Sequence, residues 1–108
     1  ESRRVENRVP GADANPYLAI AASLACGLLG MQQKLDPSAP VTASAYDMPY
    51  ALPRSLEQSL EALEHCDDLK AMLGTRFVQA WNAVKESEYD TFLQVISSWE
   101  REHLLLNV

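Results

Sequence analysis

The sequence predicts a mainly α-helical protein with one short strand at its N-terminus. Apolar residues recur at helical spacing in several segments of the chain after its first turn signal. Polar residues that favour helix N-caps stand directly before three of these segments, namely Asn15, Ser55 and Ser97. Only residues 1–9 alternate loosely as a strand does, and no second strand pattern follows. The expected strand is therefore an orphan, whose sheet lies in sequence that this chain does not contain.

The first helix is expected over residues 15–35. Asn15 is a good N-cap, and Pro16 fits the first helical position, where its missing N–H costs nothing. The segment is rich in Ala and Leu, and its apolar residues surround much of the helix, which predicts burial on several sides. Gly27 and Gly30 each cost about 1 kcal/mol relative to Ala in a helix interior. Their expected benefit is the close approach of another backbone.

Residues 36–54 hold four prolines and are predicted to form an ordered loop along a surface. Residues 55–108 are predicted to form the C-terminal helices. Ser55 and Gln58 have the spacing of a capping box, as do Ser97 and Glu100.

Between these two capping boxes, a short helical turn is expected, capped by Asp67 or Asp68 and closed by Gly74. The longest amphipathic segment then follows Thr75. Its expected apolar face consists of Phe77, Trp81, Val84, Phe92 and Ile96.

Composition limits the kind of protein and its partners. A chain of 108 residues is one domain or a piece of a larger one, and a first residue of Glu1 rather than Met favours the piece. No run of about 18 apolar residues and no secretory signal is present, so we expect a cytoplasmic protein without a membrane span. Cys26 and Cys66 are expected to be reduced thiols rather than a disulfide or metal site.

The net charge of −6 is unevenly distributed. Residues 1–10 carry three Arg against two Glu, whereas residues 11–108 carry six basic and thirteen acidic residues. An acidic body repels phosphate backbones and anionic lipid, so nucleic acid and membrane surfaces are not expected partners. The basic cluster at the N-terminus therefore requires a small, local anionic partner.

The opening RRVENRVPGADANPYLA resembles the end of the catalytic domain of glutamine synthetases. The matching positions are Arg4, Glu6, Arg8, Pro10, Asn15, Pro16, Tyr17 and Leu18, in register and without a gap. The resemblance continues more weakly to the C-terminus. It covers only the C-terminal part of a family subunit, whose catalytic domain is α+β. The ending WEREHLLLNV is more similar to the branch that joins glutamate to polyamines, the γ-glutamylpolyamine or γ-glutamylputrescine synthetases.

The resemblance implies a carbon–nitrogen ligase that uses ATP with Mg²⁺ or Mn²⁺. In this family ATP phosphorylates the side-chain carboxylate of glutamate, and ammonia or a polyamine displaces phosphate from γ-glutamyl phosphate. By carry-over, Glu6 is expected to be a metal ligand, and Arg4 to contact the nucleotide phosphates. Arg8 is expected to be catalytic, contacting glutamate and the transferring phosphoryl group. In an extended strand these alternate residues share one face, as the lining of a cleft requires.

The resemblance also implies a homo-oligomeric ring for the full-length enzyme. Leu104, Leu105 and Leu106 are candidate contacts between subunits. The family's nucleotidylated tyrosine aligns with Tyr46, but the residues before it differ here, so regulation at this position is not expected. His65 is expected at a polar helix end rather than in a metal site.

A protein of a different class is the alternative. The chain could be a stand-alone helical module that binds a partner or self-associates, and an Arg-x-Glu-x-Arg segment is often only a solvated edge strand. We expect the isolated fragment to be inactive, because one carboxylate and two arginines do not build a multi-metal nucleotide site.

Overall fold

A computed structural model describes residues 2–49 and 52–105. The part of the chain so described contains five α-helices and one 3₁₀ turn, and it forms no strand. The elements are α1 (Pro16–Gln32), η1 (Ala45–Asp47), α2 (Leu56–Glu64), α3 (Asp67–Leu73), α4 (Thr75–Leu93) and α5 (Ser98–His103). The mainly α-helical class is therefore confirmed.

Two helix starts have the predicted side-chain caps. Asn15 Oδ1 accepts hydrogen bonds from the N–H groups of Tyr17 and Leu18 at 3.0 and 3.3 Å. At the start of α5, Ser97 Oγ accepts from the Glu100 N–H at 3.2 Å, and Glu100 Oε2 accepts from the Ser97 N–H at 2.7 Å. This backbone hydrogen bond from Ser97 lowers the pKa of Glu100. Each cap satisfies backbone donors that the helix itself leaves unpaired.

Two other caps differ from the prediction in detail. Ser55 Oγ accepts from the Gln58 N–H, but the Gln58 side chain accepts from the N–H of Arg54 instead of completing the box with Ser55. Cys66 is the N-cap of α3, and its side chain makes no capping bond. Asp67 lies in the first turn of α3, where a carboxylate interacts favourably with the helix dipole.

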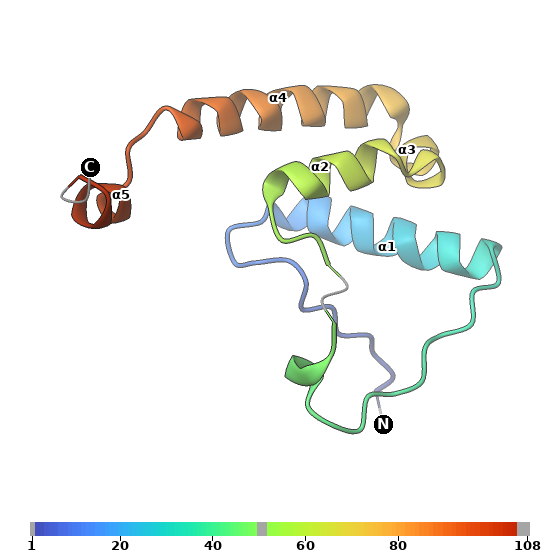
Figure 1. Ribbon diagram of the computed structural model, residues 1–108. Coiled ribbons are helices and arrows are strands. Elements are labelled where there is room, and N and C mark those ends of the chain that lie inside the picture. The colour runs from blue at the N-terminus through green and yellow to red at the C-terminus, as the bar shows by residue number, and fades with distance from the viewer. Residues whose placement is uncertain (1, 50–51, 106–108) are drawn as a thin grey trace.

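Helix α3 is the junction of the fold, because it contacts α1, α2 and α4. Gly74 joins α3 to α4 with φ 97°, a backbone conformation that residues with a Cβ adopt rarely. This sharp connection returns the chain so that α4 runs antiparallel to α2 (Figure 1). The contact between α1 and α3 includes a hydrogen bond at the C-terminal end of α1, where Gln33 Nε2 donates to Asp68 Oδ2 at 2.6 Å.

The core is small. Among the described residues, the buried apolar side chains are Ala25, Leu60 and Val78, and only Val78 is fully inaccessible. Helix α4 turns Val78 and Asn82 toward α2 and α3. Neither residue belongs to the apolar face predicted for this segment. Of that face, Trp81 is half-buried, whereas Phe77, Val84, Phe92 and Ile96 are exposed, so most of the prediction is wrong. Packing against α2 and α3, rather than the apolar pattern alone, selects which side of α4 is covered.

The arrangement is open. The radius of gyration is 18.1 Å, whereas a compact domain of this length has about 13 Å. Helix α1 packs one face against α3, and its opposite face exposes Tyr17, Ile20, Leu24, Leu28 and Met31. Helix α1 was predicted to be buried on several sides, but the described residues cover only the face that packs against α3. Likewise, no described atom lies within 4 Å of a Cβ placed on Gly27 or Gly30.

The ends of the fold lie away from the helical body. Helix α5 extends beyond the end of α4 and contacts no other described helix (Figure 1). In the 36–54 loop, which is predicted to be ordered along a surface, every described residue is exposed. No described helix is long and apolar enough to cross a membrane.

Candidate functional site

The N-terminal segment is irregular, and the predicted strand over residues 1–9 does not form in its described part, residues 2–9. A strand requires a neighbour to pair its backbone groups, and the described chain offers none. The segment is instead attached to α1 through Asn7, whose Nδ2 donates to Ser23 Oγ at 2.9 Å. The Asn7 Oδ1 atom also accepts from the N–H of Val9 at 3.0 Å.

Glu6 and Arg8 lie together on this segment. Arg8 Nε donates to Glu6 Oε1 at 2.6 Å, and the two side chains are 86% and 58% exposed for Arg8 and Glu6, respectively. An exposed ion pair contributes at most about 1 kcal/mol, so it does not hold the segment in place. What the pair provides is a carboxylate and a guanidinium side by side, both open to a ligand. Of the three residues expected to share one face of a strand, Glu6 and Arg8 thus have side chains in contact, although the strand itself does not form.

Arg4 is exposed as well, and it makes no hydrogen bond or ion pair with the rest of the described chain. Arg4 is therefore not brought to Glu6 and Arg8 by contacts within the described residues.

The residues present supply only part of a metal site. No group of three His, Cys, Asp or Glu side chains in the described ranges could hold a metal ion. Glu6 is a single hard oxygen donor, which suits Mg²⁺ or Mn²⁺, and Mg²⁺ is commonly bound through one or two carboxylates together with water and phosphate oxygens. Glu6 therefore fits as one ligand of such an ion, and further ligands must come from elsewhere.

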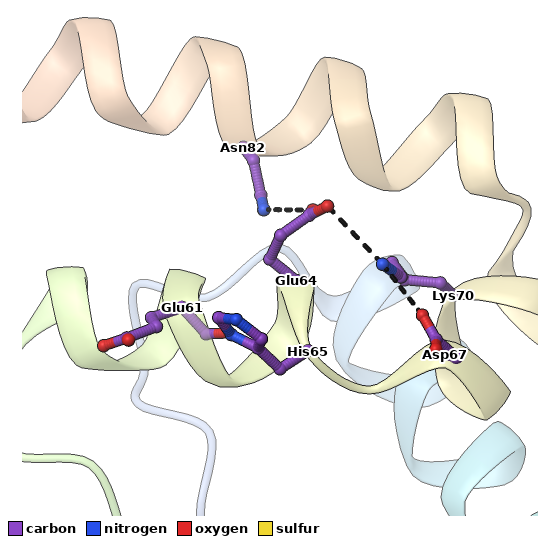
Figure 2. Close-up of polar contacts among 6 residues, drawn as sticks. All are labelled: Glu61, Glu64, His65, Asp67, Lys70 and Asn82. Carbon is purple, nitrogen blue, oxygen red and sulfur yellow. Dashed lines mark hydrogen bonds and ion pairs between the residues drawn. The ribbon is translucent and has the colours of Figure 1, made fainter.

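A second group of polar side chains lies between α2, α3 and α4 (Figure 2). Glu64 accepts from Asn82 Nδ2 at 3.3 Å through one carboxylate oxygen and from Lys70 Nζ at 3.4 Å through the other. Lys70 also pairs with Asp67 at 3.1 Å. The hydrogen bond to Asp67 is the largest cause of the raised pKa of Lys70. The sequence prediction missed this cluster, because it depends on the contact between α2 and α4.

The other residues weighed as sites remain outside any cluster. His65 Nδ1 lies 2.8 Å from the carbonyl oxygen of Glu61 at the end of α2, as expected for a polar helix end (Figure 2). Cys26 and Cys66 are both free and exposed. Tyr46 is fully exposed in η1. Leu106 lies outside the described residues.

Comparison with known proteins identifies the chain as part of a catalytic domain. The glutamine synthetase catalytic domain matches residues 1–104. The chain therefore belongs to the glutamine synthetase family.

Three relatives illustrate the range of similar proteins. A glutamate–isopropylamine ligase from a Pseudomonas species is 39% identical over 101 residues, covering 90% of this chain and 22% of that protein. A γ-glutamylethanolamide synthetase from Streptomyces coelicolor is 37% identical over 100 residues, which cover 92% of this chain and 22% of that protein. Type-1 glutamine synthetase 2 from Dictyostelium discoideum is 38% identical over 111 residues, which cover 97% of this chain and 21% of that protein. The chain thus spans about a fifth of the length of the curated relatives it matches.

Proposed function

We propose that this chain is the C-terminal part of an ATP-dependent ligase that joins the side-chain carboxylate of glutamate to an amine. The observation that carries the proposal is the family match over residues 1–104, a range that spans Arg4, Glu6 and Arg8. The names of two relatives support the same chemistry, because one is a glutamate–amine ligase and the other makes a γ-glutamyl amide.

The reaction has two steps in this proposal. The glutamate side-chain carboxylate attacks the γ-phosphorus of ATP, ADP leaves, and γ-glutamyl phosphate forms. The amine nitrogen then attacks the acyl carbon, loses a proton, and expels phosphate as the amide bond forms. Both steps gather negative charge on phosphoryl and carboxylate oxygens, and preorganised positive groups stabilise that charge.

The exposed pair at the N-terminus suits this chemistry. The Arg8 guanidinium can donate two parallel hydrogen bonds, so in this proposal it contacts glutamate and the transferring phosphoryl group. Glu6 contributes one oxygen ligand to Mg²⁺ or Mn²⁺, which when bound neutralises phosphate charge. Arg4 contacts the nucleotide phosphates. The 2.6 Å contact between Glu6 and Arg8 supports a shared site for these two residues, since it holds a metal-binding group beside a phosphoryl-binding group.

The amine is proposed to be organic, a polyamine or a short alkyl amine, rather than ammonia. The C-terminal sequence WEREHLLLNV and the names of the isopropylamine and ethanolamide relatives support this choice. Ammonia is the competing substrate, since a type-1 glutamine synthetase has similar identity.

The test is phosphate release by the full-length ligase with ATP, glutamate and Mg²⁺, comparing putrescine, isopropylamine, ethanolamine and ammonia. We expect a higher kcat/KM for an organic amine than for ammonia. The 108-residue chain alone is the matched control and is expected to give no turnover, because Glu6 supplies a single metal ligand. A preference for ammonia would overturn the amine assignment and leave the ligase intact. Full-length protein inactive with every amine would overturn the ligase itself.

Self-association is a second proposal, favoured by the exposed apolar face of α1 and by the separate position of α5, which is followed by exposed Leu104 and Leu105. We propose that the full-length enzyme is a homo-oligomer and that the fragment associates through these surfaces. Sedimentation velocity of the chain is expected to show dimers or larger species, and Leu24→Glu is expected to reduce them. A monomer at every concentration tested would contradict association of the fragment.

A further inference from the structure

A groove of about 730 Å³ runs between α2 and α4. Five carboxylates line it, which is a third of the fifteen acidic residues in the chain, and no Lys or Arg does. The five are Glu57, Glu61 and Glu64 of α2 with Glu86 and Asp90 of α4. They lie one or two turns apart on each helix, so each helix contributes an acidic stripe to the lining of the groove. Like charges arranged in this way repel, and a bound cation would relieve the repulsion.

Most of these carboxylates have no partner. Neither Glu57, Glu61, Glu86 nor Asp90 makes a side-chain hydrogen bond or ion pair within the described part of the chain. Glu64 differs, because Lys70 and Asn82 both donate to it (Figure 2). Lys70 shows how an ammonium group can bind near Glu64. Its Nζ pairs with the carboxylates of Glu64 at 3.4 Å and Asp67 at 3.1 Å.

Asn82 gives an independent indication of a ligand. Asn82 is only 7% exposed and lines the groove. Its side chain projects from α4 toward α2 (Figure 2). Its Nδ2 donates to Glu64, whereas its Oδ1 has no hydrogen-bond partner in the described structure. A buried carbonyl oxygen without a donor is costly. The Oδ1 atom has less than 1 Å² of exposed surface, so an N–H donor entering the groove would satisfy it once the Asn82 amide rotates toward the ligand.

The shape of the acidic stripes selects the kind of cation. No three of these side chains converge closely enough to hold a metal ion. With a rise of about 1.5 Å per residue, Glu57 and Glu64 instead lie about 10 Å apart along the helix axis. Apolar side chains of Leu60, Ala83 and Leu93 line the same groove and suit a hydrocarbon chain. Spaced carboxylates with apolar surface between them match a linear cation that has ammonium groups separated by methylenes.

We propose that the α2–α4 groove binds a linear aliphatic polyamine. Ammonium groups of the ligand pair with the two acidic stripes, one N–H reaches Asn82 Oδ1, and the methylenes lie against the apolar lining. This site shares no residue with the Arg4, Glu6 and Arg8 segment. It does not depend on the proposed ligase activity.

The experiment is calorimetric titration of the full-length protein with spermidine at low salt, without ATP or glutamate. Comparison ligands are n-butylamine, Mg²⁺ and a lysine-rich tetrapeptide. We expect spermidine to bind more tightly than each of these, and less tightly when added salt screens the charges. Glu61→Gln and Glu86→Gln keep the side-chain shape, and each is expected to weaken spermidine binding about two- to fivefold. Glu102→Gln on α5 removes the same charge outside the groove and is expected to leave the dissociation constant unchanged.

Three outcomes would overturn the proposal. If spermidine binds no more tightly than n-butylamine, the groove does not recognise the spaced ammonium groups of a polyamine. Tighter binding of Mg²⁺ or of the tetrapeptide would assign the groove to a different occupant. An equal loss of binding in Glu102→Gln would show that net charge, rather than the groove, is responsible. Because the assay measures binding without turnover, its failure leaves the proposed ligase untouched.

Discussion

Replacing Arg8 with lysine in the full-length ligase is expected to lower kcat by about 10²–10³-fold, the loss typical when one preorganised donor to a developing charge is removed. Lysine keeps the positive charge but lacks the planar fork that donates two parallel hydrogen bonds to carboxylate or phosphoryl oxygens. The effect should therefore appear in turnover rather than in folding. The measurement is steady-state phosphate release with ATP, glutamate and the preferred amine.

The structure separates this effect from a loss of stability. The Arg8 side chain is 86% exposed, and its only ion-pair partner among the described residues is the exposed Glu6, so little folding energy depends on it. Arg3→Lys is the matched control, since it makes the same change in the same segment at a position off the proposed face. We expect Arg3→Lys to retain full activity. Normal turnover by Arg8→Lys would remove Arg8 from the catalytic site.

Replacing Glu6 with alanine is expected to abolish measurable turnover of the full-length enzyme, a loss of at least about a hundredfold. The proposed reason is that a ligand of Mg²⁺ or Mn²⁺ is lost, and with it the positioning of charge at the phosphates. Direct Mn²⁺ binding gives a second readout that does not require activity. We expect Glu6→Ala to weaken Mn²⁺ binding at least about tenfold.

Glu6 is exposed, so its removal should leave the helices intact, which circular dichroism can verify. Glu102→Ala on α5 is the control for general loss of negative charge. If Glu6→Ala binds Mn²⁺ as the parent enzyme does, Glu6 is not a metal ligand, whatever happens to the rate. If turnover also stays near the parent value, Glu6 has no part in the active site.

The helix starts were predictable because they depend on neighbouring residues. Asn15 caps α1 with hydrogen bonds two and three residues along the chain, and Ser97 and Glu100 form their box over the same short distance. Gly74 was likewise predicted to end α3. Such contacts form whatever the rest of the fold does, so the amino-acid order is sufficient to specify them.

The errors share a different cause. The strand at residues 1–9 required a second strand that the described chain does not contain. The covered side of α4 is centred on Val78 and Asn82, whereas Phe92 of the predicted face is exposed. An apolar pattern shows which positions can be buried, but the neighbouring helix decides which of them are.

The candidate sites divide in the same way. Glu6 and Arg8 were predicted from a local motif and remain proposed site residues, and their side chains form an ion pair. The α2–α4 groove was not found, although the spacing of Glu57, Glu61 and Glu64 was a signal for one of its two sides. Its second side comes from residues of α4, such as Asn82, which lies 18 positions after Glu64.

Amino-acid order thus determined where most helices begin, which residues carry charge at the N-terminus, and which family motif they form. Tertiary structure alone decided that α4 returns along α2, that Asn82 is buried with one unsatisfied oxygen, and that acidic residues of both helices line one groove. The physical reason is the distance along the chain over which each interaction acts. Caps and motifs act within a few residues, whereas burial and electrostatic repulsion depend on which distant surfaces meet.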